Sequence, residues 1–103
     1  MVVTSEPHKI MLLKVGPDSY RARPSFEAVA PGEDVRFINW TEGSVDITFA
    51  AGLFGQDTLT LTAGSKNTLT VQDQLPDGRY PYTARVGTIV VVGESSPEII
   101  IDR

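Results

Sequence analysis

The chain has 103 residues, of which 41% are hydrophobic and 21% charged, a composition typical of one globular domain spanning residues 1–103. It contains no cysteine, which excludes disulfides, thiolate metal sites and cysteine nucleophiles. The 9 Lys and Arg residues against 13 Asp and Glu residues give a net charge of -4. These basic residues are scattered along the sequence without a run that would follow a phosphate backbone, so we expect no nucleic-acid binding.

No apolar stretch reaches the ~20 residues that a membrane-spanning helix needs, so we expect no membrane association. The first residues, Met1 to Glu6, lack the basic and apolar regions of a secretory signal. We therefore expect a cytoplasmic protein, or a periplasmic or secreted one if a leader has been removed.

The sequence consists of short runs rich in β-branched residues, separated by Gly, Pro, Asn and Asp, a pattern typical of an all-β sandwich or barrel. No segment keeps a 3.6-residue hydrophobic period over two turns, so little helix is expected. In chain order, the predicted strands are His8–Val15, Ser25–Ala30, Val35–Trp40, Val45–Phe49, Thr58–Thr62, Asn67–Val71, Arg79–Val86, Ile89–Val92 and Glu98–Ile101.

Alternation of apolar and polar residues assigns two faces to each predicted strand. In the fourth strand, Val45, Ile47 and Phe49 share one face, and Asp46 and Thr48 share the other.

Two neighbouring runs, Thr58–Thr62 and Asn67–Val71, flank the turn sequence Ala63-Gly64-Ser65, and we expect them to pair as a hairpin. Further along, Pro81 removes a backbone donor from the predicted strand Arg79–Val86. This proline is therefore expected at a sheet edge or a bulge.

Three segments, in this order, resemble the cupredoxin family of copper-binding β-sandwiches. Phe26–Asn39 is similar to the family's glycine-acidic turn and the strand that ends in asparagine, and Val45–Phe49 to the strand that carries its first histidine ligand. Leu75–Ala84 is similar to the glycine-x-aromatic-x-aromatic approach to its cysteine ligand, and Pro97–Asp102 would be the closing strand. The resemblance implies an antiparallel Greek-key β-sandwich. An immunoglobulin-like or fibronectin-like sandwich fits the same strand count.

The copper ligands of the family are not retained. By the resemblance, Asp46 stands for the first histidine, Ala84 for the cysteine and Gly87 for the second histidine, while Thr88–Val92 replaces a methionine-bearing loop. An electron-transfer copper site needs two imidazoles and a thiolate, so we expect neither copper nor another cofactor in this chain.

His8 is the only histidine and is expected to be an ordinary residue at the start of a strand. A serine nucleophile needs a base within hydrogen-bond reach, and the sequence contains no nucleophile-elbow, phosphate-loop or metalloprotease motif. We therefore expect no catalytic residues and no enzymatic activity. A metal-handling protein with an oxygen-rich site that includes His8 is the alternative function.

Four residues are candidates for interaction. Asp46 and Arg85 would lie near the same end of the sandwich, either paired or as unrelated surface charges. Ile89 and Val91 belong to the uncharged run Thr88–Val92. This run either forms an exposed edge that adds a strand to a partner or to a second copy, or it pairs inside the sandwich as core.

The sequence thus favours a non-catalytic binding or structural module that acts through contacts with a partner protein or as a homo-oligomer. Trp40 and Phe54 would form a contact patch if they were exposed, although burial is the more common fate of such aromatic residues.

Overall fold

The computed structural model describes residues 8–17, 19–91 and 97–102, with only the backbone described at Val90. These residues form ten strands and contain no helix, and hence none that would cross a membrane. The strands are β1 (His8–Gly16), β2 (Ser19–Arg23), β3 (Phe26–Val29), β4 (Asp34–Asn39), β5 (Val45–Phe49), β6 (Thr58–Leu61), β7 (Lys66–Thr70), β8 (Gly78–Val86), β9 (Ile89–Val91) and β10 (Glu98–Ile101).

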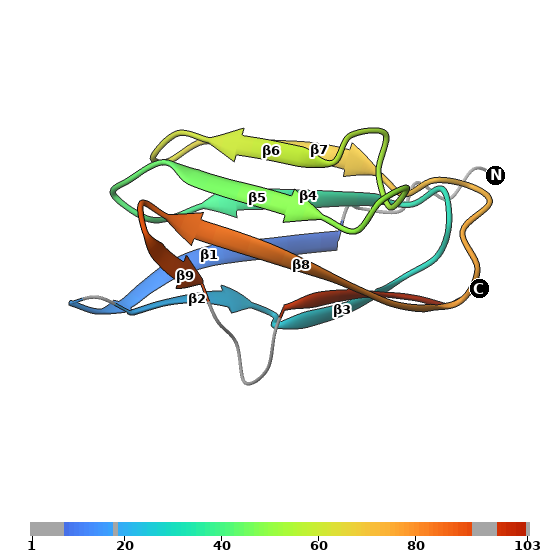
Figure 1. Ribbon diagram of the computed structural model, residues 1–103, viewed down its shortest axis with the longest axis horizontal. Coiled ribbons are helices and arrows are strands. Elements are labelled where there is room, and N and C mark those ends of the chain that lie inside the picture. Colours follow the sequence, from blue (N-terminus) through green and yellow to red (C-terminus); the bar gives the residue numbers. More distant parts are fainter. Residues whose placement is uncertain (1–7, 18, 92–96, 103) are drawn as a thin grey trace, which may run out of the picture.

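Two sheets pack face to face as a sandwich (Figure 1). The smaller sheet has the order β2-β1-β4-β7, and the larger has the order β3-β10-β8-β5-β6 with β9 also paired to β8. Both sheets are mixed, because β1 and β4 run parallel, as do β3 and β10. The antiparallel pairing expected from the sequence therefore does not hold for β1 with β4 or for β3 with β10. Parallel neighbours need a long crossover, and between β1 and β4 the chain passes through β3 in the opposite sheet.

The hairpin predicted between Thr58–Thr62 and Asn67–Val71 is wrong. β6 pairs with β5 in the larger sheet, whereas β7 pairs with β4 in the smaller one. The connection 62–65 therefore crosses between the sheets instead of closing a hairpin. The strand β2 was not expected from the sequence, because its single fully buried side chain is the small Ala22, flanked by two exposed arginines.

Pro81 meets its expectation locally. β5 pairs with β8 only as far as Phe49 opposite Tyr82, so at Pro81 the strand β8 has passed the end of β5. On its other side, Pro81 lies opposite Glu98 of β10. At Pro81, β8 is therefore paired with β10 on one side and is not paired with β5 on the other. A proline, which lacks a backbone N–H, is tolerated at such a position.

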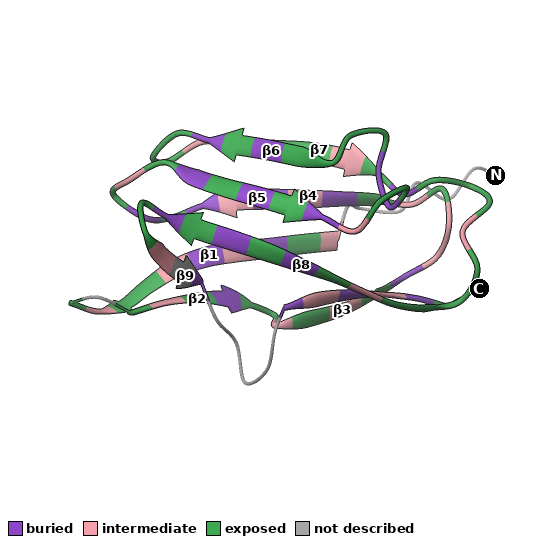
Figure 2. Ribbon diagram, in the orientation of Figure 1, coloured by how far each residue is buried: buried purple, intermediate pink, exposed green. Residues whose placement is uncertain are grey.

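Strict alternation builds the core between the sheets. Figure 2 shows buried and exposed bands alternating along β5 and β8. Val45, Ile47 and Phe49, which were predicted to share one face, are all buried. Leu53 and Phe54, from the connection between β5 and β6, are buried as well.

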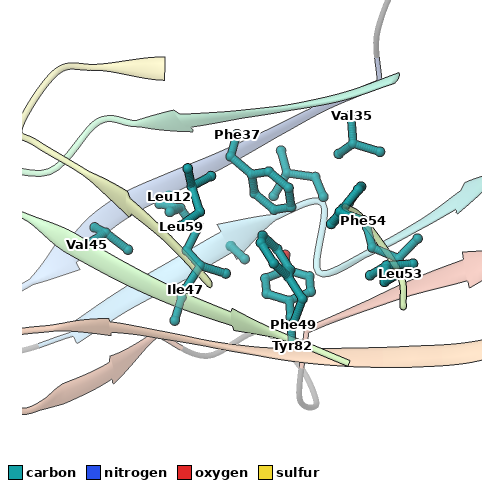
Figure 3. Packing of buried hydrophobic residues seen from close by; sticks show 14 of the residues in the cluster. Leu12, Val35, Phe37, Val45, Ile47, Phe49, Leu53, Phe54, Leu59 and Tyr82 are labelled. Carbon is teal, nitrogen blue, oxygen red and sulfur yellow. The ribbon is translucent and has the colours of Figure 1, made fainter. Parts of the chain in front are cut away.

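An aromatic cluster fills one half of this core (Figure 3). The ring of Phe37 lies 5.4 Å from that of Phe49 and 5.6 Å from that of Tyr82, and Phe49 lies 4.7 Å from Phe54, in tilted or edge-on geometry. Such edge-on pairs add to the free energy gained from burial alone. Tyr80 is partly buried against the cluster, so both tyrosines of the aromatic run pack on the core.

Candidate functional site

Three connections gather at one end of the sandwich, the left end in Figure 1: residues 40–44, 62–65 and 87–88. We call this the loop end. It includes the turn after β8, the place where the sequence resemblance puts the missing copper ligands.

The interior of the loop end is filled by aliphatic side chains. Val45 lies opposite Val86, and Ile47 lies opposite Ala84, across the β5–β8 pair. All four are buried, Val45 and Ala84 completely. A Cβ added at Gly43 would lie 3.2 Å from a methyl group of Val86, so the packing here is tight.

The three positions that stand for copper ligands do not converge. Ala84 points into the core, whereas Asp46 lies on the outer face of the same strand pair, opposite Arg85. Gly87 is exposed in the turn, at a φ of 63°. The interior residue at this end of β5 is Val45, so Asp46, which stands for the first histidine by the resemblance, lies on the other side of the sheet from Ala84.

Asp46 and Arg85 are nevertheless direct neighbours in register. The Asp46 carboxylate accepts a hydrogen bond of 2.8 Å from the Thr60 hydroxyl, and among the described residues no ion pair joins it to Arg85. The two charges therefore lie side by side on an exposed surface, where a pair would contribute little.

The turn between β8 and β9 has only two residues, Gly87 and Thr88, because Val86 pairs directly with Ile89. Val91 lies opposite Ala84 and is fully buried, and Ile89 is half-buried. β9 also lies close to β2 of the other sheet (Figure 1). The sequence left open whether this run is an exposed edge or part of the core. The burial of Val91 places that side chain in the core.

Asn39 ties the loop end together. Its buried side-chain amide donates to the carbonyl oxygens of Gly43, Leu61 and Thr62 at 2.9, 3.0 and 3.1 Å. Its Oδ1 accepts from the backbone N–H and the hydroxyl of Thr41 at 2.9 and 2.7 Å. One side chain therefore holds two of the three connections in place.

This architecture is shared with solved structures of amicyanin, a cupredoxin. A mutant of amicyanin in its reduced Cu(I) form at pH 4 matches with a TM-score of 0.65 and 16% identity, covering 97% of this chain and 86% of that one. Amicyanin from Paracoccus versutus matches with a TM-score of 0.65 and 16% identity, covering 97% and 85%. The fold is cupredoxin-like. No protein-family model matches the sequence, and neither does any curated protein.

At the other end of this cupredoxin-like sandwich, His8 lies between two carboxylates. Its Nε2 is 3.3 Å from Glu33 and its Nδ1 is 3.8 Å from Glu27. Each ring nitrogen thus faces a different carboxylate, so the three groups do not converge on one point. Among the described residues there is no group of three or more His, Cys, Asp or Glu side chains arranged to hold a metal ion.

Glu33 also closes the turn before β4. Its carboxylate accepts a 2.7 Å hydrogen bond from the backbone N–H of Ala30. This bond, more than the contact with His8, lowers the pKa of Glu33 below its usual value of 4.5. The role that geometry supports for this cluster is to fix the β3–β4 turn.

Trp40 of the cupredoxin-like fold is 65% exposed, while Phe54 is buried, so the two do not form the joint patch considered from the sequence. The indole borders a shallow hollow of about 460 Å³ that is also lined by Ile38 and Lys66. Sequence reasoning did not find this hollow, because Ile38 and Lys66 meet only through the pairing of β4 with β7.

Proposed function

We propose that this chain is a non-catalytic, copper-free module of cupredoxin-like fold that acts by binding another protein. The observation that carries the proposal is the filled interior of the loop end. Val45, Ala84 and Val86 occupy the space between the sheets there, and the turn at 87–88 supplies no loop. Aliphatic side chains offer no donor atom to a soft metal ion.

The absence of catalysis is supported by the placing of His8. It is the only histidine in the chain, and each of its ring nitrogens faces a carboxylate. General acid–base or nucleophilic chemistry needs a base with access to a substrate in a cleft. The hollow at Trp40 contains neither a carboxylate nor an imidazole among its lining residues.

Protein binding is supported by Trp40. This residue is 65% exposed, and tryptophan is among the residues that contribute most to binding energy at protein interfaces.

A metal-loading experiment tests the copper-free part of the proposal. The purified chain is incubated with excess Cu(I), Cu(II) or Zn(II), exchanged into metal-free buffer, and measured by elemental analysis. We expect far less than one ion per chain. Retention of about one copper ion per chain after EDTA treatment would overturn the proposal.

The alternative, a metal-handling protein, has one observation in its favour: an imidazole flanked by two carboxylates. The same loading experiment on a His8→Ala variant separates the alternatives. Zinc or copper that the natural chain retains and the variant loses would establish a site at His8. Equal and negligible retention by both chains supports the module.

A further inference from the structure

We propose that the outer face of the smaller sheet docks a partner protein that presents carboxylates around an apolar patch. This inference rests on the protein-binding function proposed above and specifies its surface and its partner. We call this surface the basic face. It comprises Lys9, Met11, Leu13, Arg21, Arg23, Arg36, Ile38, Trp40 and Lys66.

The basic face follows from alternation in four strands. Ile10 and Leu12 of β1, and Val35 and Phe37 of β4, are fully buried in the core. Their neighbours in sequence must therefore point to the other side of the sheet. Ala22 of β2 is buried in the same way, which turns the arginines on either side of it outward.

Register places an apolar centre between cations. Arg23 of β2 lies opposite Met11, Met11 opposite Ile38, and Ile38 opposite Lys66 of β7. This row has a cation at each end, on the two edge strands, and two apolar residues in the middle, on the central strands. Such an apolar centre with a charged rim is the usual anatomy of a protein interface.

The two adjacent rows extend this pattern. On one side, Arg21 lies opposite Leu13, and Trp40 continues from β4 with its N–H bonded to the carbonyl of Leu12. On the other side, Lys9 lies opposite Arg36. The apolar centre therefore spans two rows, and cations border it on three sides.

The charge of this face is opposite to that of the whole chain. Five of the 9 basic residues lie on it, although the chain carries a net charge of -4. The four strands contain a single acidic residue, Asp34, which points to the same side as Arg36 because Val35 between them is buried. Its carboxylate accepts a hydrogen bond from the Thr70 hydroxyl. None of the five cations forms an ion pair with any described residue. Arg36 donates a hydrogen bond of 3.1 Å to the neutral Thr68 hydroxyl. Within the part of the chain that the structure describes, the five charges are therefore not neutralised by a carboxylate.

A protein suits this face better than a nucleic acid or an anionic membrane. The centre is largely aliphatic, whereas single-stranded bases stack on aromatic rings, of which the face has one. The molecule extends over 45 × 27 × 22 Å. A long duplex or a bilayer would reach past the patch and meet the net negative charge, while a local carboxylate cluster on a protein would not.

The size of the face indicates a weak, salt-sensitive complex. Four strands spaced by ~4.8 Å and a rise of ~3.3 Å per residue make the patch roughly 15 Å by 13 Å. The area of this outline is well below the ~800 Å² of surface that each partner buries in a standard interface.

Titrations followed by amide NMR shifts and by Trp40 fluorescence test the inference. The probes are a synthetic peptide of Glu and Leu residues, its counterpart with Gln in place of Glu, phosphatidylserine vesicles and a DNA duplex. We expect the acidic peptide to bind most tightly, to shift amides of β1, β2 and β4, and to weaken as salt is raised. Tighter binding of the vesicles or the duplex would overturn the choice of partner.

Charge-reversed variants locate the binding surface. Arg23→Glu and Lys66→Glu should each weaken peptide binding by roughly tenfold, because each sets a like charge against the probe. Arg85→Glu changes the net charge equally but lies on the outer face of the larger sheet, and we expect it to weaken binding much less. An equal loss with Arg85→Glu, or no loss with the other two, would overturn the inference.

The two proposals fail separately. Retention of copper in the loading experiment contradicts the proposed function whatever the peptide does. A chain that retains no metal and does not bind the acidic peptide contradicts only the basic face as its docking surface.

Discussion

Asn39 is the residue on which the loop end depends most. Its amide group meets three carbonyl oxygens, and its carbonyl oxygen meets two donors of Thr41, all within a fully buried site. The backbone N–H of Asn39 also donates to Ser65 at 2.9 Å. Since both ends of the side chain are used, no other residue type satisfies every partner.

We therefore expect Asn39→Asp to destabilise the fold strongly. The substitution sets a carboxylate oxygen against three carbonyls and leaves them without their donor, at a cost of about 3 kcal/mol or more in the free energy of unfolding. Urea denaturation followed by circular dichroism measures it. The exposed Asn67 provides the control, because Asn67→Asp keeps the oxygen that accepts from the N–H of Thr68. Equal stability of the two variants would contradict this role for Asn39.

Glu33 makes part of the stability depend on pH. The folded state lowers the pKa of this carboxyl, chiefly through the N–H of Ala30, so the ionised form is the one stabilised. The contribution is therefore present at neutral pH and is lost as the pH falls through the folded-state pKa, below the usual value of 4.5.

The prediction concerns Glu33→Gln, which cannot ionise. At about pH 6 the variant should be less stable than the natural chain by roughly 0.5–1 kcal/mol, a modest figure because the carboxylate is partly exposed. The difference should shrink as the pH falls below 4.5 through the lowered folded-state pKa, and should be smallest at about pH 2. Urea denaturation at both pH values measures it, and a difference that stays constant would show that the carboxylate charge is not what stabilises the turn.

At the scale of elements, β9 contributes a side chain to the core at Val91, while its backbone pairs with one neighbour, β8, among the described strands. Val91 is fully buried against Ala84, so a charge placed there would be desolvated. A Val91→Lys variant should lose more than about 3 kcal/mol in the free energy of unfolding. Thr88→Lys, in the exposed turn, should lose almost nothing.

Thermal unfolding together with light scattering distinguishes a core role of Val91 from a role in self-association. If Val91→Lys dissociated an oligomer while leaving the melting temperature of the fold unchanged, the segment would be an interface and not core.

The sequence predicted the strands better than it predicted their partners. Alternation alone predicted the two faces of β5, because Val45, Ile47 and Phe49 are apolar and the residues between them, Asp46 and Thr48, are polar. It said nothing about which sheet β6 and β7 would join, since period two defines a face and not a neighbour. The strand β2 was not predicted, because its only fully buried residue is a small alanine and its apolar pattern is therefore weak.

The candidate site was less predictable for the same reason. Scattered along the sequence, the cations of the basic face form no run, and only the register of β2, β1, β4 and β7 brings them together. Asp46 and Arg85 lie opposite each other in the β5–β8 pair. The sequence alone could not identify the interior position at this end of β5, because that requires knowing which way each side chain points.

At the scale of the whole molecule, charge is divided unevenly, and Trp40 can report it. It is the only tryptophan, and Lys66 lines the same hollow. We expect iodide to quench its fluorescence more strongly than caesium, each measured relative to its quenching of free N-acetyltryptophanamide, because the surrounding cations concentrate anions near the indole. The preference should weaken at high salt and in Lys66→Glu, and persist in Arg85→Glu. Equal quenching by the two ions would show that the face has no positive potential.

The short turn at Gly87 and Thr88 has a consequence for engineering. It joins two strands whose pairing begins immediately on either side, and a Cβ added at Gly87 would meet no atom within 4 Å. The cost of closing a flexible loop grows by only about 0.6 kcal/mol for each doubling of its length. Foreign peptides inserted between these two residues would therefore be displayed outward from a rigid support, making the chain a cysteine-free scaffold for loop libraries.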